Sequence, residues 1–290
     1  MSDSLASLRH KLSAAEHLGS VVRAMKAISA SSIGQYEKAI EALGQYRHSV
    51  ELGLSLCLRD TQRVPAILAG GADRPTGALI FGSDQGLVGR FNEVVADFAR
   101  ETLAKLPGPK TVWAVGERVC PPLEAADLAI AKRFVVPSSV TAITALVTEI
   151  QIEIEEYMAG ERHGEIYVFH NSPRAPAHYE SASERLLPLD AAWYQRLRAI
   201  PWPNAQLAQV LGGGTASLSA LIHERLFISV YGACAESLAS EHASRLEAMQ
   251  RAEKNIESVA DDLRRSLNRL RQSSIDEELF DVVAGFNALA

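Results

Sequence analysis

Residues 237–272 read SLASEHASRLEAMQRAEKNIESVADDLRRSLNRLRQ, and this stretch decides the fold. No proline follows Pro203, so nothing interrupts a helix from about 217 to 287. Such a helix would be on the order of 100 Å long at 1.5 Å per residue, longer than a compact domain is wide. We therefore predict a projecting C-terminal helix. Its large apolar residues recur at helical spacing as one stripe from 243 onward, formed by Leu246, Met249, Ile256, Leu263, Leu267 and Leu270.

The flanks of this helix carry acidic residues four positions before basic ones, which is the favourable order on a solvated helix surface. Glu253 interrupts the apolar stripe. The pattern predicts an exposed rod with one apolar seam. The three predicted pairs are Glu241 with Arg245, Glu247 with Arg251, and Asp261 with Arg265.

The N-terminal segment from Ser4 to about Cys57 has no proline and predicts a second long helix. Two long helices can cover their apolar stripes by packing against each other as an antiparallel coiled coil. The N-terminal stripe comprises Leu5, Leu8, Leu12, Ala15, Val22 and Met25.

The middle of the chain changes character at residues 65–75, where proline and glycine cluster and a new domain is expected to begin. Alternating strand and helix patterns predict a small, mainly parallel sheet covered by helices, a Rossmann-like α/β domain. The predicted domains are 1–60, 76–200 and 215–290. The expected strands are 78–81, 111–115, 134–136 and 165–169, with 177–189 as an edge strand, the expected helices are 93–106 and 141–158, and residues 201–214 form a return linker.

The turn Gly82–Gly89, with sequence GSDQGLVG, stands where phosphate-binding loops occur, after a strand and before a helix. It matches neither GxGxxG nor a loop ending in GK and Ser or Thr, so we interpret it as a structural turn that uses glycine for positive φ and close packing. His163, His170 and His178 match no zinc spacing. No catalytic, cofactor-binding or metal-ligating residues are predicted.

Composition limits the partners and the location. A net charge of −6 and a pI near 5.8 disfavour nucleic acid as a partner. Cys57, Cys120 and Cys234 are far apart and fit a reducing compartment. The first 17 residues lack the apolar core of a signal peptide, and no stretch approaches the roughly 20 apolar residues of a membrane span, so a cytosolic or peripheral protein is expected.

Four segments, in the expected order, resemble the gamma subunit of F-type ATPases. SLASEHASRLEAM at 237–249 is similar to the family's SEHxxRMxAM signature, and RAMKAISAS at 23–31 is similar to its KAMKMVAAS helix. GSDQGLVGRFN at 82–92 resembles its TSDRGLCGGFN turn. NRLRQ at 268–272, with the residues up to Gly285, resembles its C-terminal ending. Together these segments cover essentially the whole chain.

The resemblance implies a rotating central stalk whose coiled coil enters a hexamer of alpha and beta subunits, without catalytic sites of its own. It implies an epsilon-type subunit and the membrane c-subunit ring as further partners, no self-association, and a peripheral position on the cytoplasmic face of the bacterial inner membrane. The uncharged end from 282 to 290 suits a tip in an apolar sleeve. Taken without the resemblance, the charges near the tip would be ordinary solvated ones; the resemblance gives subunit-interface roles to Met25, Lys26, Arg269, Arg271, Gln272, Ile275 and Glu278.

Two departures from the family pattern favour a divergent, alternate bacterial type. The basic stretch expected after the N-terminal motif is replaced by SIGQYEK at 32–38, and Asp276 stands where threonine is usual. Two other classes remain open on the residues alone. They are a Rossmann-like nucleotide- or cofactor-binding enzyme with helical dimerisation arms, and a coiled-coil scaffold that self-associates.

Overall fold

The computed structural model describes residues 5–60, 75–160, 164–175, 178–189, 191–203, 208, 210 and 214–289. The chain packs as two compact units, and both long helices contribute to each of them. The sheet unit comprises residues 30–244, and the helical rod comprises residues 5–29 and 245–289. The predicted division into three domains by sequence position stays a prediction.

Two long helices frame the chain, as predicted. They are α1 (Leu5–Asp60) and α6 (Gly214–Leu289), 56 and 76 residues long. Within the sheet unit, Tyr36 of α1 stacks on His242 of α6, whereas Gly53 lies against Leu221. Residue numbers therefore rise along α1 as they fall along α6, which confirms the antiparallel pairing.

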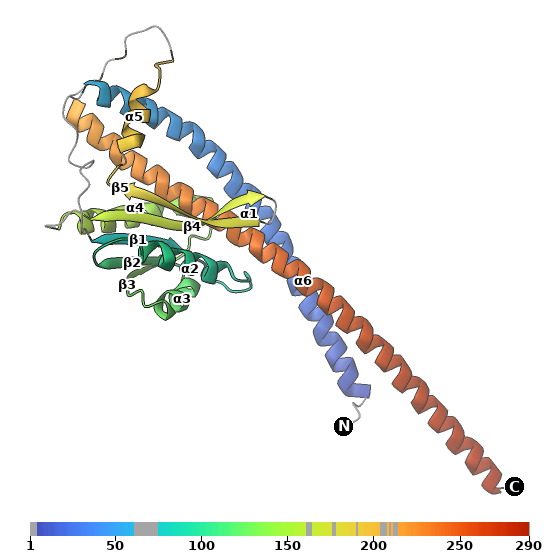
Figure 1. The fold of residues 1–290 in the computed structure, drawn as a ribbon. Coiled ribbons are helices and arrows are strands. Elements are labelled where there is room, and N and C mark those ends of the chain that lie inside the picture. The colour runs from blue at the N-terminus through green and yellow to red at the C-terminus, as the bar shows by residue number, and fades with distance from the viewer. Residues whose placement is uncertain are drawn as a thin grey trace. The chain divides into compact units, whose positions relative to one another are not determined.

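The sheet unit contains a five-stranded sheet in the order β3-β2-β1-β4-β5 (Figure 1). The first four strands are parallel and β5 is antiparallel to β4, so the predicted mainly parallel, Rossmann-like sheet with an added edge strand is confirmed. The strands are β1 (Thr76–Phe81), β2 (Lys110–Val115), β3 (Ile130–Phe134), β4 (Glu165–Ala175) and β5 (His178–Leu187). The connecting helices are α2 (Phe91–Leu103), α3 (Cys120–Ala125), preceded by the 3-10 turn Glu117–Val119, and α4 (Val140–Met158).

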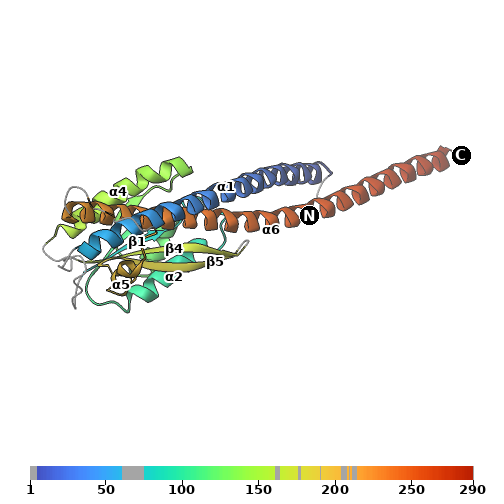
Figure 2. The same ribbon diagram turned by 90° about the horizontal axis from the view of Figure 1, so that it is seen from above.

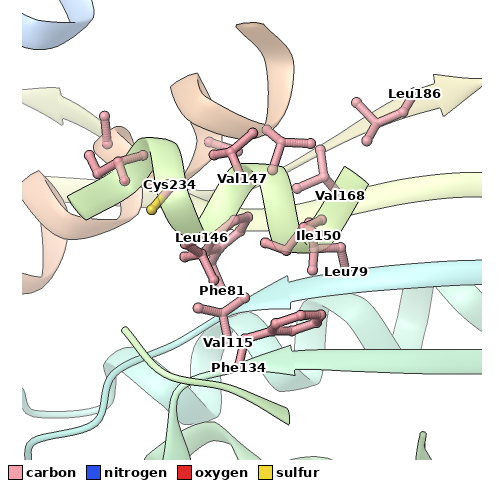
Figure 3. Close-up of a cluster of buried hydrophobic side chains, with 14 of the residues drawn as sticks. Leu79, Phe81, Val115, Phe134, Leu146, Val147, Ile150, Val168, Leu186 and Cys234 are labelled. Atoms are coloured by element: carbon pink, nitrogen blue, oxygen red, sulfur yellow. The ribbon is translucent and has the colours of Figure 1, made fainter. Parts of the chain in front are cut away.

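The two faces of the sheet have different cores because successive strand residues point to opposite sides. Ala78 and Ile80 of β1 pack with α2 and α3, whereas Leu79 and Phe81 pack with α4 and α6. Figure 3 shows the second cluster, in which Val147 and Ile150 of α4 lie over Leu79 and Phe81. The sheet is thus buried on both faces, as its continuous apolar strands require.

One predicted strand is wrong. The strand expected at 134–136 is instead β3, Ile130–Phe134. Phe134 is buried, but Val135 is 77% exposed, and the backbone N–H of Val136 donates to the Asp84 carboxylate at 2.9 Å. The chain therefore leaves the sheet after Phe134. Residues 130–133 read IAKR, so apolar and charged side chains do not alternate and no period-two pattern marks this strand in the sequence.

Helices α3 and α5 (Ala191–Ala199) were not predicted, since both are short, α3 contains Pro121 and Pro122, and α5 lies between Pro188 and Pro201. Tyr194 and Leu197 of α5 join a third buried cluster with Leu54 of α1 and Ile222 of α6. The Arg59 guanidinium of α1 donates to the carbonyls of Arg198 and Ile200. Of the punctuated stretch 65–75, only Pro75 lies within the described residues, and most of the linker expected at 201–214 lies outside them.

Candidate interaction site

The glycine-rich turn after β1 is held by its own polar side chains. Both carboxylate oxygens of Asp84 accept backbone N–H groups, from Glu117 and from Val136, each at 2.9 Å. The Asn92 amide accepts from the Ser83 N–H and donates to the Ser83 hydroxyl, again at 2.9 Å. These hydrogen bonds link the turn to neighbouring loops. The polar side chains of the turn therefore have a structural role rather than a phosphate-binding one.

Two of the three glycines of this turn, Gly82 and Gly89, are used as predicted. A Cβ on Gly82 would come within 2.4 Å of the Val119 Cβ, and Gly89 adopts φ +59°. The Ser244 hydroxyl of α6 donates to the Val88 carbonyl at 2.6 Å. The close packing and positive φ expected of a structural turn are therefore confirmed, and the turn also anchors α6 within the sheet unit.

A buried polar contact joins β4 to α6 within the sheet unit. His170 Nε2 lies 3.0 Å from Glu236 Oε2, and the His170 side chain is 9% exposed. Burial by itself raises the pKa of Glu236, but hydrogen bonds from His170 and Ser172, with the positive charge of Arg47, lower it overall. Glu236 is therefore held as a carboxylate. Tyr36 of α1 shows the opposite effect, since burial raises the pKa of its hydroxyl to about 12.

The rod is a regular heptad pairing. Its α1 seam residues fall alternately three and four positions apart, and so do those of α6. Charged residues occupy one seam position on each helix, where Lys26 Nζ lies 2.5 Å from Glu253 Oε2. The apparent interruption of the seam at Glu253 is thus an inter-helix ion pair. The seam comprises Leu8, Leu12, Ala15, Gly19, Val22, Lys26 and Ser29 on α1, and Leu246, Met249, Glu253, Ile256, Ala260, Leu263 and Leu267 on α6.

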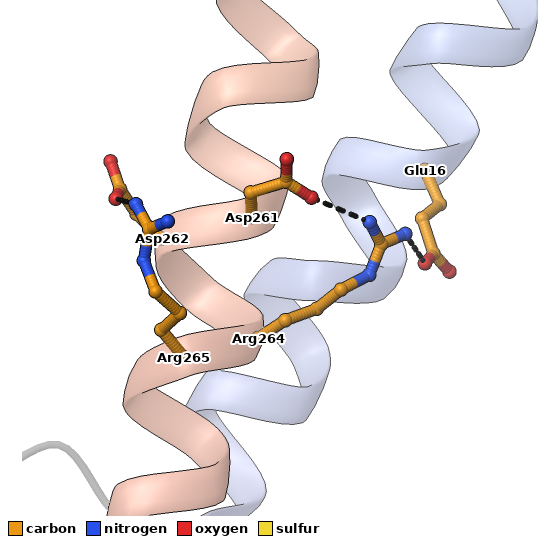
Figure 4. A network of polar contacts seen from close by, with 5 residues as sticks. All are labelled: Glu16, Asp261, Asp262, Arg264 and Arg265. Atoms are coloured by element: carbon orange, nitrogen blue, oxygen red, sulfur yellow. Dashed lines mark hydrogen bonds and ion pairs between the residues drawn. The ribbon is translucent and has the colours of Figure 1, made fainter.

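A second inter-helix contact lies further along the rod (Figure 4). Arg264 of α6 donates to Glu16 of α1 at 2.8 Å and to Asp261 at 2.9 Å, and both carboxylates raise the pKa of the guanidinium. Sequence reasoning missed the Glu16–Arg264 pair, because only a known register brings two residues 248 apart together. As α1 numbers fall from Lys26 to Glu16, α6 numbers rise from Glu253 to Arg264, so the rod is antiparallel.

The predicted flank pairs have mixed outcomes. Glu247 and Arg251 form the expected pair at 2.9 Å. The pairing of Asp261 with Arg265 is wrong, since Arg264 takes Asp261 and Arg265 binds Asp262. Glu241 and Arg245 are each 5% exposed, so the solvated flank expected there is also wrong. Their burial could not be predicted from charge order alone.

A shallow hollow of about 280 Å³ opens in the rod beside the Glu16–Arg264 pair. Ala15 and Gly19 face Ile256 and Ala260 here, and the small side chains leave space that larger seam residues would fill. Charged residues complete its wall: Glu16, Arg23, Glu257, Asp261 and Arg264.

The residues predicted to meet other subunits all lie on the rod. Met25 is half-buried, and Lys26 is committed to Glu253. Within the rod, α6 continues past the first described residue of α1 (Figure 2). Every residue from 268 to 284 is exposed, including the apolar side chains of Leu279, Phe280, Val282 and Val283. The same exposed stretch carries the predicted contacts Arg269, Arg271, Gln272, Ile275 and Glu278, and the structure groups them on this single helix.

No helix within the described residues combines the length and the apolar character that crossing a membrane would need.

The fold and its exposed rod define a class of protein in which an antiparallel coiled coil is joined to a Rossmann-like α/β unit. A family model described as ATP synthase matches residues 4–289. The curated relatives it resembles are named ATP synthase gamma chain. They include that of Lachnoclostridium phytofermentans, 25% identical over 99% of both chains, and that of Anaeromyxobacter dehalogenans, 26% identical over 99% of both. The chain therefore belongs to the ATP synthase gamma-chain family.

Solved structures agree on the fold. A chain of the Euglena gracilis mitochondrial ATP synthase, from a structure of its OSCP, F1 and c-ring, aligns with a TM-score of 0.65 at 16% identity, over 98% of this chain and 94% of that one. A central-stalk and c-ring structure from Tetrahymena thermophila aligns with a TM-score of 0.58 at 20% identity, over 80% of this chain and 99% of that one. At these identities the likeness speaks for the architecture alone.

Proposed function

We propose that this chain is the rotating central-stalk subunit of an F-type ATP synthase or ATPase. It couples ion flow through the membrane sector to ATP synthesis or hydrolysis in a hexamer of alpha and beta subunits. One observation carries this function. In this chain of the gamma family, the rod is a heptad pairing whose register is fixed by the Lys26–Glu253 ion pair. Beyond the paired part, α6 continues with a row of exposed apolar side chains.

The physical basis is a coupling of conformational equilibria. A rod surface that differs from side to side stabilises different conformations in the subunits it meets, and turning it changes which subunit is stabilised. Two packed helices with ion pairs across the seam resist sliding past each other, so rotation at one end is transmitted to the other. Nucleotide chemistry takes place in the beta subunits, and this chain changes their affinities.

The exposed end of α6 is the surface we assign to direct contact with the hexamer. Arg269 and Arg271 are free of the seam, and guanidinium groups form strong paired hydrogen bonds with acidic loops. Gln272, Ile275 and Glu278 share the exposure of this segment. Lys26 has a different role. Its ammonium group is paired with Glu253, so it contributes by fixing the register of the helix pair.

The sheet unit is the part that we expect to meet the epsilon-type subunit and the c-subunit ring. The chain is then held at the cytoplasmic face of the bacterial inner membrane through the complex. Asp276, where the family usually has threonine, lies in the exposed part of α6 and supports an alternate bacterial type.

The test is the composition of the native complex. The tagged chain is purified from its own membranes under mild detergent, and subunit stoichiometry is measured by native mass spectrometry. We expect one copy with three alpha-type and three beta-type chains. A homo-oligomer without nucleotide-binding chains would contradict the proposal and favour a scaffold, and ATP turnover by the highly purified isolated chain would favour an enzyme.

A further inference from the structure

Polar side chains join α6 to the sheet at three levels of the sheet unit. The Arg225 guanidinium donates to the Glu184 carboxylate of β5 at 2.5 Å, and the Ser244 hydroxyl donates to the Val88 carbonyl at 2.6 Å. Between them lies the buried contact of β4 with α6 described above. From residue 225 to residue 244 these contacts span about 28 Å of helix at 1.5 Å per residue. They therefore hold α6 along the part of the helix whose side chains pack into the sheet core.

The contacts at the two ends are firmly placed. The Arg225 side chain is only 14% exposed, and its guanidinium also lies 5.7 Å from the centre of the Trp193 ring. Glu184 belongs to β5, which is paired with β4. Val88 is buried in the glycine turn, which Asp84 links to neighbouring loops. Both partners of α6 therefore move with the sheet rather than with the helix.

Helix α1 is attached in a different way. Within the described residues, Tyr36 is its one buried side chain in the cluster that covers this face of the sheet, whereas α6 contributes a row that includes Leu226, Val230 and Leu238. The buried residues of α1 that follow Tyr36 belong instead to the cluster shared with α5 and α6. The long helix that lies on the sheet is thus α6, and α1 packs chiefly against α6 and α5.

Apolar packing and hydrogen bonds resist the turning of a helix to different degrees. Apolar contact is non-directional, so it fixes the distance of a helix from a sheet more firmly than its angle. A hydrogen bond weakens steeply once the angle at its hydrogen falls below about 120°. The three polar contacts would all have to break for α6 to roll on the sheet. They are therefore the contacts that fix its angular position.

We propose that the sheet unit transmits torque to the rod through α6, and that Arg225, Glu236 and Ser244 are the positioning residues that lock this helix against rolling on the sheet. This inference rests on the central-stalk function proposed above, in which force passes between the sheet unit and the rod. Because α6 is one continuous helix from Gly214 to Leu289, an angle fixed at 225–244 is carried into the rod. Helix α1 then turns with α6 because the two helices are paired.

The experiment uses the assembled complex in which the first and the last of these contacts are removed, by Glu184→Gln, Arg225→Met and Ser244→Ala together. Substituting both members of the ion pair avoids leaving a buried charge without its partner. The matched control is Tyr46→Phe with Arg59→Met on α1, which removes hydrogen bonds of that helix to α6 and to the end of α5. ATP hydrolysis and ATP-driven ion pumping are measured on the same preparations, first without and then against an opposing ion gradient.

The expected difference appears only under load. Without an opposing gradient, both variants should hydrolyse ATP and pump as the unsubstituted complex does. Against a steep gradient, the ions pumped per ATP should fall by about fivefold or more in the triple variant, the lower end of ordinary coupling factors, and should not change in the α1 control. Ser244→Ala alone should show a smaller loss, and Ser244→Thr, which keeps the hydroxyl, should show none. Equal pumping by the triple variant and the control against the gradient would overturn the proposal, whether both pumped normally or both failed.

A general loss of stability would give a different pattern. Leu123→Ala removes a buried side chain from the cluster on the opposite face of the sheet. Measured below its melting temperature, this variant should pump normally against the gradient. A loss as large as that of the triple variant would overturn the proposal, because pumping would then follow stability rather than the contacts of α6.

Two further outcomes are kept apart by the same preparations. Should the triple variant not assemble, the comparison of Ser244→Ala with Ser244→Thr decides, and equal pumping by these two against the gradient would overturn the proposal. Failure of the unsubstituted chain to assemble with alpha-type and beta-type subunits would instead remove the central-stalk function itself.

Discussion

Leucine and isoleucine side chains are buried in the core of the sheet unit, whereas several of them are exposed on the rod. Leu79 and Ile80 of β1 are 0% exposed, whereas Leu18 of α1 is 54% exposed and Ile28 is 63% exposed. The sheet unit buries its apolar residues against its own helices, so its stability comes from inside the chain. The rod buries one row of apolar residues in its seam and leaves other apolar residues exposed. This difference indicates that the rod has surfaces meant for other subunits.

The largest expected effect comes from making one substitution in both units. Leu79→Ala removes a buried side chain from the sheet core and should lower the free energy of unfolding by about 2–5 kcal/mol. Leu18→Ala in the isolated chain should change it by no more than about 0.5 kcal/mol, because the side chain is already hydrated. Urea unfolding of both variants measures the contrast. Similar losses at the two sites would mean that the rod is covered within the chain.

Gly82→Ala tests whether the glycine turn is structural. The new methyl group would lie within 2.4 Å of Val119, so we expect a loss of about 1–3 kcal/mol in thermal or urea unfolding. Gly86→Ala is the control in the same turn, because nothing lies within 4 Å of the position that its methyl group would take and its φ is not positive. It should be close to neutral. If the two variants unfolded alike, close packing at Gly82 would not matter.

The ion pair in the rod seam should have a smaller effect. A double-mutant cycle with Lys26→Met and Glu253→Gln should give a coupling energy of about 0.5–1 kcal/mol, because the two side chains remain 36% and 16% exposed and solvent screens them. Circular dichroism during unfolding at low and high salt measures it. The Glu16–Arg264 pair, with both side chains about half exposed, serves as the comparison and should couple more weakly. Stronger coupling at Glu16–Arg264 would contradict this order.

Acid should weaken the sheet unit through Glu236. The pKa of its carboxyl is lowered in the folded chain, so its stabilisation is fully present above the ordinary value of 4.5 and is lost as pH falls through the lower folded value. Glu236→Gln should therefore be less stable than the unsubstituted chain at pH 7, and its melting temperature should fall less between pH 7 and pH 3. A parallel fall in both proteins would exclude this carboxylate as a source of acid sensitivity.

Much of the fold could be predicted because its signals are local and periodic. Heptad spacing and the absence of proline were enough for α1 and α6, and apolar runs located β1, β2 and β4. Strand β3 was misplaced because Val135 and Val136 are apolar but lie beyond the end of the sheet. The Val135 side chain is exposed, and the Val136 N–H donates to Asp84 instead of to a neighbouring strand. Helix α5 depends on packing against α1 and α6, which no local pattern reveals.

The interaction surface was predicted less completely. Residues 269–278 were assigned through a family resemblance, and their exposure suits that assignment without testing it. Lys26 was expected to face another subunit, but its partner Glu253 is 227 positions away, and only the register of the helix pair brings the two together. Leu18, Val21, Met25 and Ile28 form an exposed row on α1 with the same three-four spacing as the seam, which follows one residue later. Sequence periodicity alone cannot separate two such rows, and burial is what distinguishes them.

Amide hydrogen exchange of the isolated chain and of the assembled complex tests the central claim most directly. If the rod is a stalk inside a ring of other subunits, peptides covering 18–28 and 268–284 should exchange more slowly in the complex, while the buried strand 76–81 should be equally protected in both. Unchanged exchange in both rod peptides of a complex with confirmed stoichiometry would contradict the account.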